Sequence, residues 1–324
     1  MPYDVAAIVI GFAFLVWGAD RFVVGAGATA RNLGVPPILI GLTIVGFATS
    51  APEILVSVVA SLQDTPGLAV GNAVGSNIAN IGLVLGFAAL VRPMEIRSQT
   101  LRRELPALLV VTLVSYMLCT DQVLSRADGF ILLVGLALLL YWIITLGFRS
   151  SAGDPMSADY AAEIPSDMTM ARALGWLAIG LTVLLIGSNL LVNGAVAIAQ
   201  SLGVSELVIG LTIVAIGTSL PELAVTTMSA LKGEHGLAVG NIIGSNMFNL
   251  LAVMGLAAAI APSTLEPPVL GLHLPVMIGL TLALFVMAYN YGAGEGRVNR
   301  WEGGALLATF FAYHGYVAAT TLGL

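Results

Sequence analysis

Residues 33–86 read LGVPPILIGLTIVGFATSAPEILVSVVASLQDTPGLAVGNAVGSNIANIGLVLG, and residues 202–255 read LGVSELVIGLTIVAIGTSLPELAVTTMSALKGEHGLAVGNIIGSNMFNLLAVMG. The two stretches align without a gap at an offset of 169 residues, and 27 of the 54 aligned positions are identical. A match of this length within one chain indicates an internal duplication. Weaker pairing continues upstream, where Gly18 stands opposite Gly187, so the first apolar segment belongs to the repeat as well.

The composition is that of a membrane protein. The chain has 324 residues, of which 58% are hydrophobic and 9% charged, whereas soluble domains carry about 25% charged residues. Apolar runs such as residues 129–148, GFILLVGLALLLYWIITLGF, have the roughly 20 residues that a helix needs to cross a bilayer. We predict an all-α, multi-pass integral membrane protein. The formal net charge of −6 argues against nucleic-acid binding.

Apolar segments predict ten transmembrane helices, five in each half of the chain. They lie near residues 5–30, 37–62, 69–91, 105–120, 129–148, 174–200, 206–231, 237–261, 273–291 and 302–322. Because each half has an odd number of spans, the second copy enters the membrane from the opposite face, as in many secondary transporters. The predicted organisation is a first repeat over 1–148, a short acidic cytoplasmic linker over 149–172 and a second, inverted repeat over 173–324.

Basic residues indicate how these spans are oriented, because Lys and Arg collect in cytoplasmic loops. Ten of the 12 Lys and Arg residues fall in loops on one side of the predicted topology, and Arg126 falls on the other. The remaining Arg21 lies inside the first span, where its side chain can extend to the membrane surface. We therefore expect a protein of the cell membrane with both termini on the extracytoplasmic side.

Two acidic residues, Glu53 and Glu222, lie well inside predicted spans, and the repeat superposes them. Placing either charge at the centre of a membrane helix costs about 2.5 to 3.5 kcal/mol. Each follows a proline, Pro52 or Pro221, which removes an N–H from the helix and should free the carbonyl four residues earlier. The second and seventh spans are therefore predicted to be broken helices, which are tolerated where they line a polar cavity.

Short polar side chains recur around these acids at intervals of four, so each set shares one helix face. The four sets are Thr49, Glu53 and Ser57; Thr218, Glu222 and Thr226; Asn72, Ser76 and Asn80; and Asn241, Ser245 and Asn249. Glycines at the same interval in the two GN segments would let those helices approach closely. Facing oxygens of this kind suit a hard cation such as calcium or sodium. No Cys or His occurs in any set, which disfavours softer metals.

Two motifs that both occur twice carry a family resemblance: TSAPE at 49–53 with GNAVGSN at 71–77, and TSLPE at 218–222 with GNIIGSN at 240–246. With these motifs the chain resembles the calcium/cation antiporter superfamily, and in particular its prokaryotic sodium/calcium exchangers, over its whole length. The resemblance implies a ten-helix fold in which ions bind midway between the halves and access alternates between the two sides of the membrane.

The resemblance also implies the site residues. Glu53 and Glu222 match the main calcium and sodium ligands. Further oxygens would come from Thr49, Ser50, Ser76, Asn80, Thr218, Ser219, Ser245 and Asn249, and from the backbone carbonyls of Gly46 and Ala215. The sequence departs from the family at Asn249, where some relatives, including potassium-dependent ones, have Asp. It also has Gly75-Ser76 where proton-coupled relatives have a Glu-His pair, which favours sodium over protons.

The expected function is secondary antiport of calcium against sodium at a midplane site, with no enzymatic activity and no cofactor. The implied partners are the two ions and the lipid bilayer, without nucleic acid and without an obligate protein partner. Proton-coupled calcium or cation exchange, in which both glutamates titrate, is the alternative, and a passive cation channel is a further one. An intramembrane hydrolase using Ser50 or Ser219 is disfavoured, because no base accompanies either serine.

Overall fold

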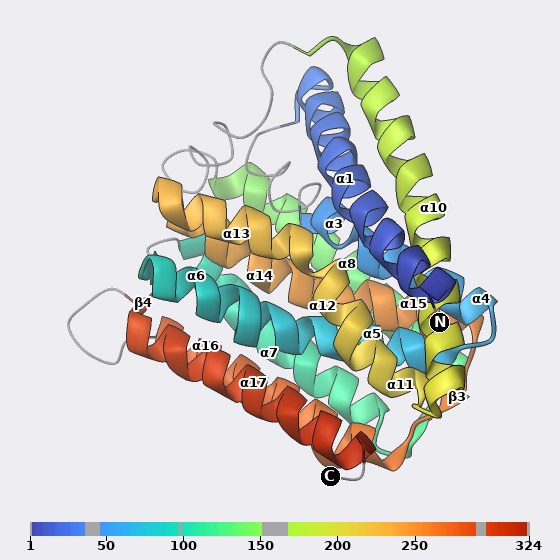
Figure 1. Ribbon diagram of the computed structural model, residues 1–324. Helices are drawn as coiled ribbons and strands as arrows, with labels where there is room; N and C mark the ends of the chain where they lie inside the picture. The colour runs from blue at the N-terminus through green and yellow to red at the C-terminus, as the bar shows by residue number, and fades with distance from the viewer. Residues whose placement is uncertain (1, 36–45, 97–98, 151–167, 290–295, 323–324) are drawn as a thin grey trace.

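The computed structural model describes residues 2–35, 46–96, 99–150, 168–289 and 296–322, and helices account for most of them (Figure 1). In the first half the helices are α1 (Pro2–Asn32), α3 (Gly46–Thr49), α4 (Ala51–Leu62), α5 (Pro66–Ala79), the π-helical η2 (Asn80–Leu85), α6 (Gly86–Val91), α7 (Gln99–Leu118) and α8 (Arg126–Ser150). Most of the predicted linker over 149–172 lies outside the described residues.

The second half repeats this order of helices. Its members are α10 (Met170–Leu202), α11 (Glu206–Ile209), η3 (Gly210–Val214), α12 (Ala215–Thr218), α13 (Leu220–Lys232), α14 (His235–Phe248), η4 (Asn249–Val253), α15 (Met254–Ile260), η5 (Val269–His273), α16 (Leu274–Ala288) and α17 (Arg300–Leu322). The η segments are again π-helical.

Six of the described helices are long and apolar enough to cross a membrane. They cover Pro2–Asn32, Pro66–Val91, Arg126–Thr145, Met170–Leu202, His235–Ile260 and Val269–Ala288. A seventh candidate is the pair Glu206–Thr218 and Leu220–Lys232, which bends by 42° between its two parts. The chain is therefore an all-α, multi-pass membrane protein, as predicted. The count of ten spans and their inversion stay predictions.

Four short strands join loops of the two halves. β1 (Met94–Ile96) pairs antiparallel with β4 (Gly296–Val298). β2 (Val123–Leu124) pairs antiparallel with β3 (Ser263–Thr264). Each pair connects a loop of the first half with a loop of the second. Backbone hydrogen bonds therefore join the two halves at both ends of the helix bundle.

Helices α1 and α10 form a long pair that stands at an angle to the other helices (Figure 1). Glycines allow the two backbones to touch. A Cβ added to Gly11 would lie 2.9 Å from the carbonyl oxygen of Gly187, and one added to Gly18 would lie 3.2 Å from that of Gly180. The two contacts are equivalent under the repeat, because Gly11 corresponds to Gly180 and Gly18 to Gly187. The pair therefore crosses about a local two-fold axis.

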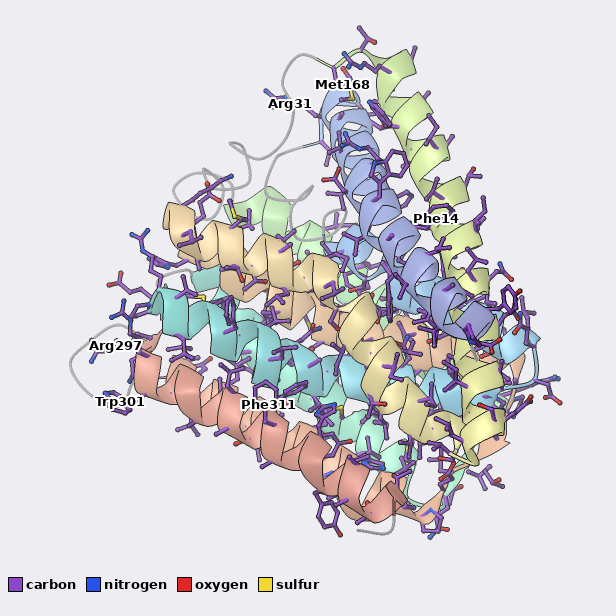
Figure 2. The ribbon with its side chains drawn as sticks, viewed as in Figure 1. Phe14, Arg31, Met168, Arg297, Trp301 and Phe311 are labelled. Carbon is purple, nitrogen blue, oxygen red and sulfur yellow. The ribbon has the colours of Figure 1, made fainter. Side chains whose placement is uncertain are left out.

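The centre of the bundle is made by the two helices that follow the broken segments. In the most apolar 18-residue stretch of the helix at 66–91, 78% is buried inside the protein. The corresponding share is 83% in the helix at 235–260 and 28% in α1. The outer helices carry the exposed apolar side chains, such as Phe14 on α1 and Phe311 on α17 (Figure 2). The enclosed helices carry the GN motifs, which places their polar side chains at the middle of the protein.

Candidate cation site between the two repeats

Each TSxPE motif produces a break followed by a new helix. Ser50 separates α3 from α4, and Ser219 separates α12 from α13, with φ near −83° at both serines. Pro52 and Pro221 lie in the first turn of the new helices, where the missing N–H of proline is not needed. The sequence predicted a break near these prolines, and in the structure the break lies two residues before each of them, at Ser50 and Ser219.

The break places both glutamates at the start of a helix in the protein interior. Glu53 lies in the first turn of α4, Glu222 in the first turn of α13, and neither is exposed. Carboxylates near a helix N-terminus are stabilised by its unpaired N–H groups. This contribution is smaller than the cost of removing a carboxylate from water, so further polar groups are needed around each glutamate.

Serines from the opposite repeat supply part of this environment. Ser50 Oγ donates to Glu222 Oε1 at 3.5 Å, and Ser219 Oγ donates to Glu53 Oε1 at 3.4 Å. Ser245 Oγ donates a further bond to Glu222 Oε1 at 3.3 Å. The two carboxylates are therefore held next to each other's helix break, on either side of the two-fold axis.

Threonines of the breaks also reach the opposite repeat. Thr49 Oγ1 donates to Asn241 Oδ1 at 3.2 Å, and Thr218 Oγ1 donates to Asn72 Oδ1 at 3.1 Å. Hydroxyl contacts accompany them, at 3.4 Å between Thr49 and Ser245 and at 3.5 Å between Thr218 and Ser76. All six side chains are at most 5% exposed.

Asn72 and Asn241 are fixed from their other end. Asn72 Nδ2 donates to Ser57 Oγ at 2.9 Å and to the backbone carbonyl of Glu53 at 3.1 Å. Asn241 Nδ2 donates to Thr226 Oγ1 at 3.2 Å. Both asparagines belong to the predicted polar faces, but the sequence did not identify them as the residues that link the halves.

Several buried oxygens of the cluster have no hydrogen-bond partner among the described residues. They are Glu53 Oε2, Glu222 Oε2, Asn77 Oδ1, Asn80 Oδ1 and Asn249 Oδ1. Buried polar atoms are normally paired, so the second oxygen of each buried carboxylate, unpaired among the described residues, indicates a place for a positively charged partner. Calcium and sodium both take oxygen ligands of this kind.

Hydrogen bonds therefore join most of the predicted side chains, namely Thr49, Ser50, Glu53, Ser76, Thr218, Ser219, Glu222 and Ser245. Asn80 and Asn249 are buried further along the same enclosed helices as Ser76 and Ser245. The two predicted backbone ligands lie on the short helices that precede the breaks. The carbonyl oxygen of Ala215 accepts from Ser219 N at 3.1 Å and from Thr218 Oγ1 at 3.4 Å. Gly46 is the first residue of α3. Asn77 and Asn246 are buried on the same two enclosed helices and were not among the predicted ligands. Both repeats have asparagine at this position, and this match in the sequence could have indicated that the two residues matter.

Comparison with known proteins gives one consistent family. The model of the sodium/calcium exchanger protein family matches residues 3–149 and 172–319. A putative antiporter, CaxA from Alkalimonas amylolytica, is 48% identical over 94% of this chain and 96% of its own length. The sodium/calcium exchanger MaX1 from Methanosarcina acetivorans is 32% identical over 94% of this chain and 96% of its own.

A solved structure agrees with these sequences. The sodium-calcium exchanger NCX_Mj, in crystals soaked with sodium and strontium, superposes with a TM-score of 0.67 at 33% sequence identity. The superposition covers 96% of this chain and 97% of that chain. The likeness thus includes both halves and the helices that carry the site.

Proposed function

Because the chain belongs to the family of sodium/calcium exchanger proteins, which are transporters, we propose that it exchanges calcium for sodium across the cell membrane. The observation that carries this proposal is the pair of fully buried glutamates, each hydrogen-bonded by a serine of the opposite repeat. A cation that binds between them would neutralise both charges. The same two carboxylates can serve one calcium ion or sodium ions in turn, but not both together.

The proposed ligands are side-chain oxygens from both repeats and two backbone carbonyls. They are Glu53, Thr49, Ser50, Ser76 and Asn80 with the carbonyl of Gly46 in the first repeat, and Glu222, Thr218, Ser219, Ser245 and Asn249 with the carbonyl of Ala215 in the second. No cofactor takes part in this proposal, since the gradient of one ion drives movement of the other.

The proposed topology is ten spans in two inverted repeats, over 1–148 and 173–324, with broken helices in the second and seventh spans and both termini extracytoplasmic. The paired strands support it, because β1 and β4 lie in loops predicted to be cytoplasmic and β2 and β3 in loops predicted to be extracytoplasmic. Arg92 supports it too, since its guanidinium donates to the carbonyl of Leu231 at 2.6 Å beside a second predicted cytoplasmic loop. In Figure 2, Arg31 and Arg297 lie toward the end of the molecule opposite the chain termini of Figure 1.

Coupling would follow from the cost of the empty site. Two unpaired carboxylates in a low-dielectric interior repel each other and lack hydration. A conformational change that moves the site from one face to the other is therefore least costly when cations accompany it. Alternating access of this kind is typical of transporters built from inverted repeats.

Uptake of calcium-45 into proteoliposomes tests the proposal. With pH clamped equal on both sides, an outward sodium gradient should drive calcium uptake, and dissipating that gradient should stop it. Uptake driven by a proton gradient without sodium would establish proton-coupled exchange instead. Calcium flux that needs no counter-ion gradient and is not stimulated by one would indicate a channel.

A further inference from the structure

Four buried asparagines stand at equivalent positions on the two enclosed helices. They are Asn77 and Asn80 in the first repeat and Asn246 and Asn249 in the second, called here the asparagine quartet, and each is at most 2% exposed. Asn80 and Asn249 belong to the proposed ligands. Asn77 and Asn246 have no role in the proposed function so far.

The quartet breaks a symmetry that the serine and threonine hydrogen bonds between the two repeats obey. Asn80 Nδ2 donates to Asn246 Oδ1 at 3.2 Å. At the equivalent positions of the repeat, the matching bond would run from Asn249 Nδ2 to Asn77 Oδ1. Both of those atoms are instead buried and without a hydrogen-bond partner among the described residues.

Other contacts across the repeat do occur in equivalent pairs. Ser50 with Glu222 matches Ser219 with Glu53, and the two Thr–Asn bonds match in the same way. The segments that carry the missing bond are also in contact, since α5 packs against η4 just as α14 packs against η2. The asymmetry therefore lies in the amide groups and their local geometry, within a frame that is equivalent on both sides.

We infer that Asn246 and Asn77 are positioning residues that act in turn: each holds the NH2 group of the ligand asparagine of the other repeat, so that its amide oxygen faces the cation. The Asn80–Asn246 bond belongs to the conformation described, and the Asn249–Asn77 bond belongs to the conformation with opposite access. This inference rests on the proposed function, because the exchange of roles follows from two equivalent halves that alternate.

The chemistry of the amide explains the effect on binding. An asparagine offers one oxygen acceptor and two N–H donors, and only the oxygen attracts a cation. When a partner accepts from the NH2 group, the orientation is fixed with the oxygen free, as at Asn80. An amide held by no partner can also turn its NH2 group toward the ion. Affinity at one membrane face should therefore depend on Asn246, and affinity at the other on Asn77.

The test measures calcium affinity at each face separately. Asn246→Leu and Asn77→Leu remove the acceptor oxygen, and sodium-driven calcium uptake is measured in right-side-out and inside-out membrane vesicles. Each variant should raise the half-saturating calcium concentration about threefold to tenfold, the value of one hydrogen bond, at one face only and at opposite faces for the two variants. The maximal rate should change less than the half-saturating concentration.

Conservative variants separate positioning from general disturbance. Asn246→Asp and Asn77→Asp retain an acceptor oxygen, so neither should raise the half-saturating concentration. Met277→Leu removes only the sulfur that Asn77 Nδ2 contacts at 3.5 Å and should leave both faces unchanged. If a leucine variant is not monodisperse in detergent, alanine at the same position provides the same loss of the acceptor.

The inference is overturned if both variants weaken binding equally at both faces, or if neither changes affinity at either face while the unsubstituted protein exchanges calcium for sodium. Absence of exchange in the unsubstituted protein overturns the proposed function itself, and the inference with it. The two failures are therefore distinguished by the first measurement.

Discussion

Glu53 and Glu222 are the residues on which the proposed transport depends. Both are fully buried, and each has one carboxylate oxygen bonded across the repeat and one that finds no partner in the part of the chain that the structure describes. A charge in that position is tolerated only if something compensates it. In the proposed site, the bonded oxygen fixes the orientation of the carboxylate and the second oxygen contacts the cation.

Glu53→Gln and Glu222→Gln test this division directly. Each substitution keeps the size of the side chain and removes its charge, and a lost charged contact is worth about 1.5 to 3 kcal/mol. Sodium-driven calcium uptake should therefore fall by roughly 10-fold to 150-fold in each variant, while both variants still insert and remain monodisperse. Glu206→Gln, at the start of α11 and outside the cluster, is the matched control and should transport normally. Normal exchange by either of the first two variants contradicts the ligand assignment.

The serines at the helix breaks lead to a milder prediction. Ser50→Ala and Ser219→Ala each remove one hydroxyl that donates to a carboxylate of the other repeat. Loss of one such bond should raise the half-saturating calcium concentration about threefold to tenfold, by similar factors in the two variants. Initial rates of uptake at several calcium concentrations check this. A large effect of one serine with none of the other would show that the two halves of the site are not equivalent.

At the residue scale the duplicated motifs predicted nearly all of the clustered side chains. Position in the repeat brought Thr49, Ser76 and their counterparts to the right helix faces. The sequence could not assign the partner of Asn72, because a hydrogen bond across the repeat depends on how two helices pack. A break near Pro52 was predicted, but the exact residue at which the new helix begins, Ala51, was not.

Glycine determines how closely whole helices approach. Along α1 and α10 the contacts at Gly11, Gly18, Gly180 and Gly187 join backbone to backbone. Gly71 and Gly75 do the same for α5, whose neighbours there are α11, η3 and α12 of the other repeat. The sequence predicted close approach for the glycines of the GN segments, but it could not tell which helix would be the neighbour.

Gly180→Ala should destabilise the α1–α10 pair. The added Cβ would lie 2.5 Å from the backbone nitrogen of Phe22, so the helices must separate. Overpacking of this kind costs about 1 to 3 kcal/mol, which a thermal melt followed by fluorescence-detected size exclusion would register as a lower midpoint. Gly175→Ala is the matched control on the same helix, because a Cβ there meets no atom within 4 Å. Equal midpoints for the two variants would contradict the packing described.

The boundaries of the elements were predicted less well than their existence. The third span was predicted from residue 69, and its helix begins at Pro66. The π-helical segments η2 and η4, which begin at Asn80 and Asn249, leave no mark in hydropathy. Polarity and packing decide such local changes in winding, and neither can be derived from an apolar run.

For the molecule as a whole, topology and orientation can be tested together with thiol chemistry. Cys119 follows the end of α7 and its thiol is buried. Because a buried thiol is out of reach of an aqueous reagent, Cys119 should not react with a maleimide at pH 7.5 in the folded protein. Its reactivity should rise only as the protein unfolds.

This silent native thiol makes introduced cysteines informative. Arg126→Cys and Lys232→Cys occupy exposed positions in loops that the ten-span topology assigns to opposite faces. In sealed right-side-out vesicles a membrane-impermeant maleimide should label Arg126→Cys at once and Lys232→Cys only after permeabilisation. Labelling of both from the same face would contradict the proposed inversion of the second repeat.

Class and family were predictable from the chain, because composition fixes the membrane setting and paired motifs are specific. The way in which the two halves pack against each other was harder to predict from the sequence. It depends on contacts such as those of β1 with β4 and of Ser50 with Glu222, which join residues far apart in the chain and have no pattern of their own.

The exchange of serines between the halves has a consequence for ancestry. Since Ser50 serves Glu222 and Ser219 serves Glu53, a lone half-length polypeptide would carry an incomplete site, whereas two identical copies in antiparallel assembly would complete each other. A gene encoding one half could thus have been useful before it was doubled and fused. After fusion each copy still limits the sequence changes that the other can accept, because each carries a serine that serves the glutamate of the other copy.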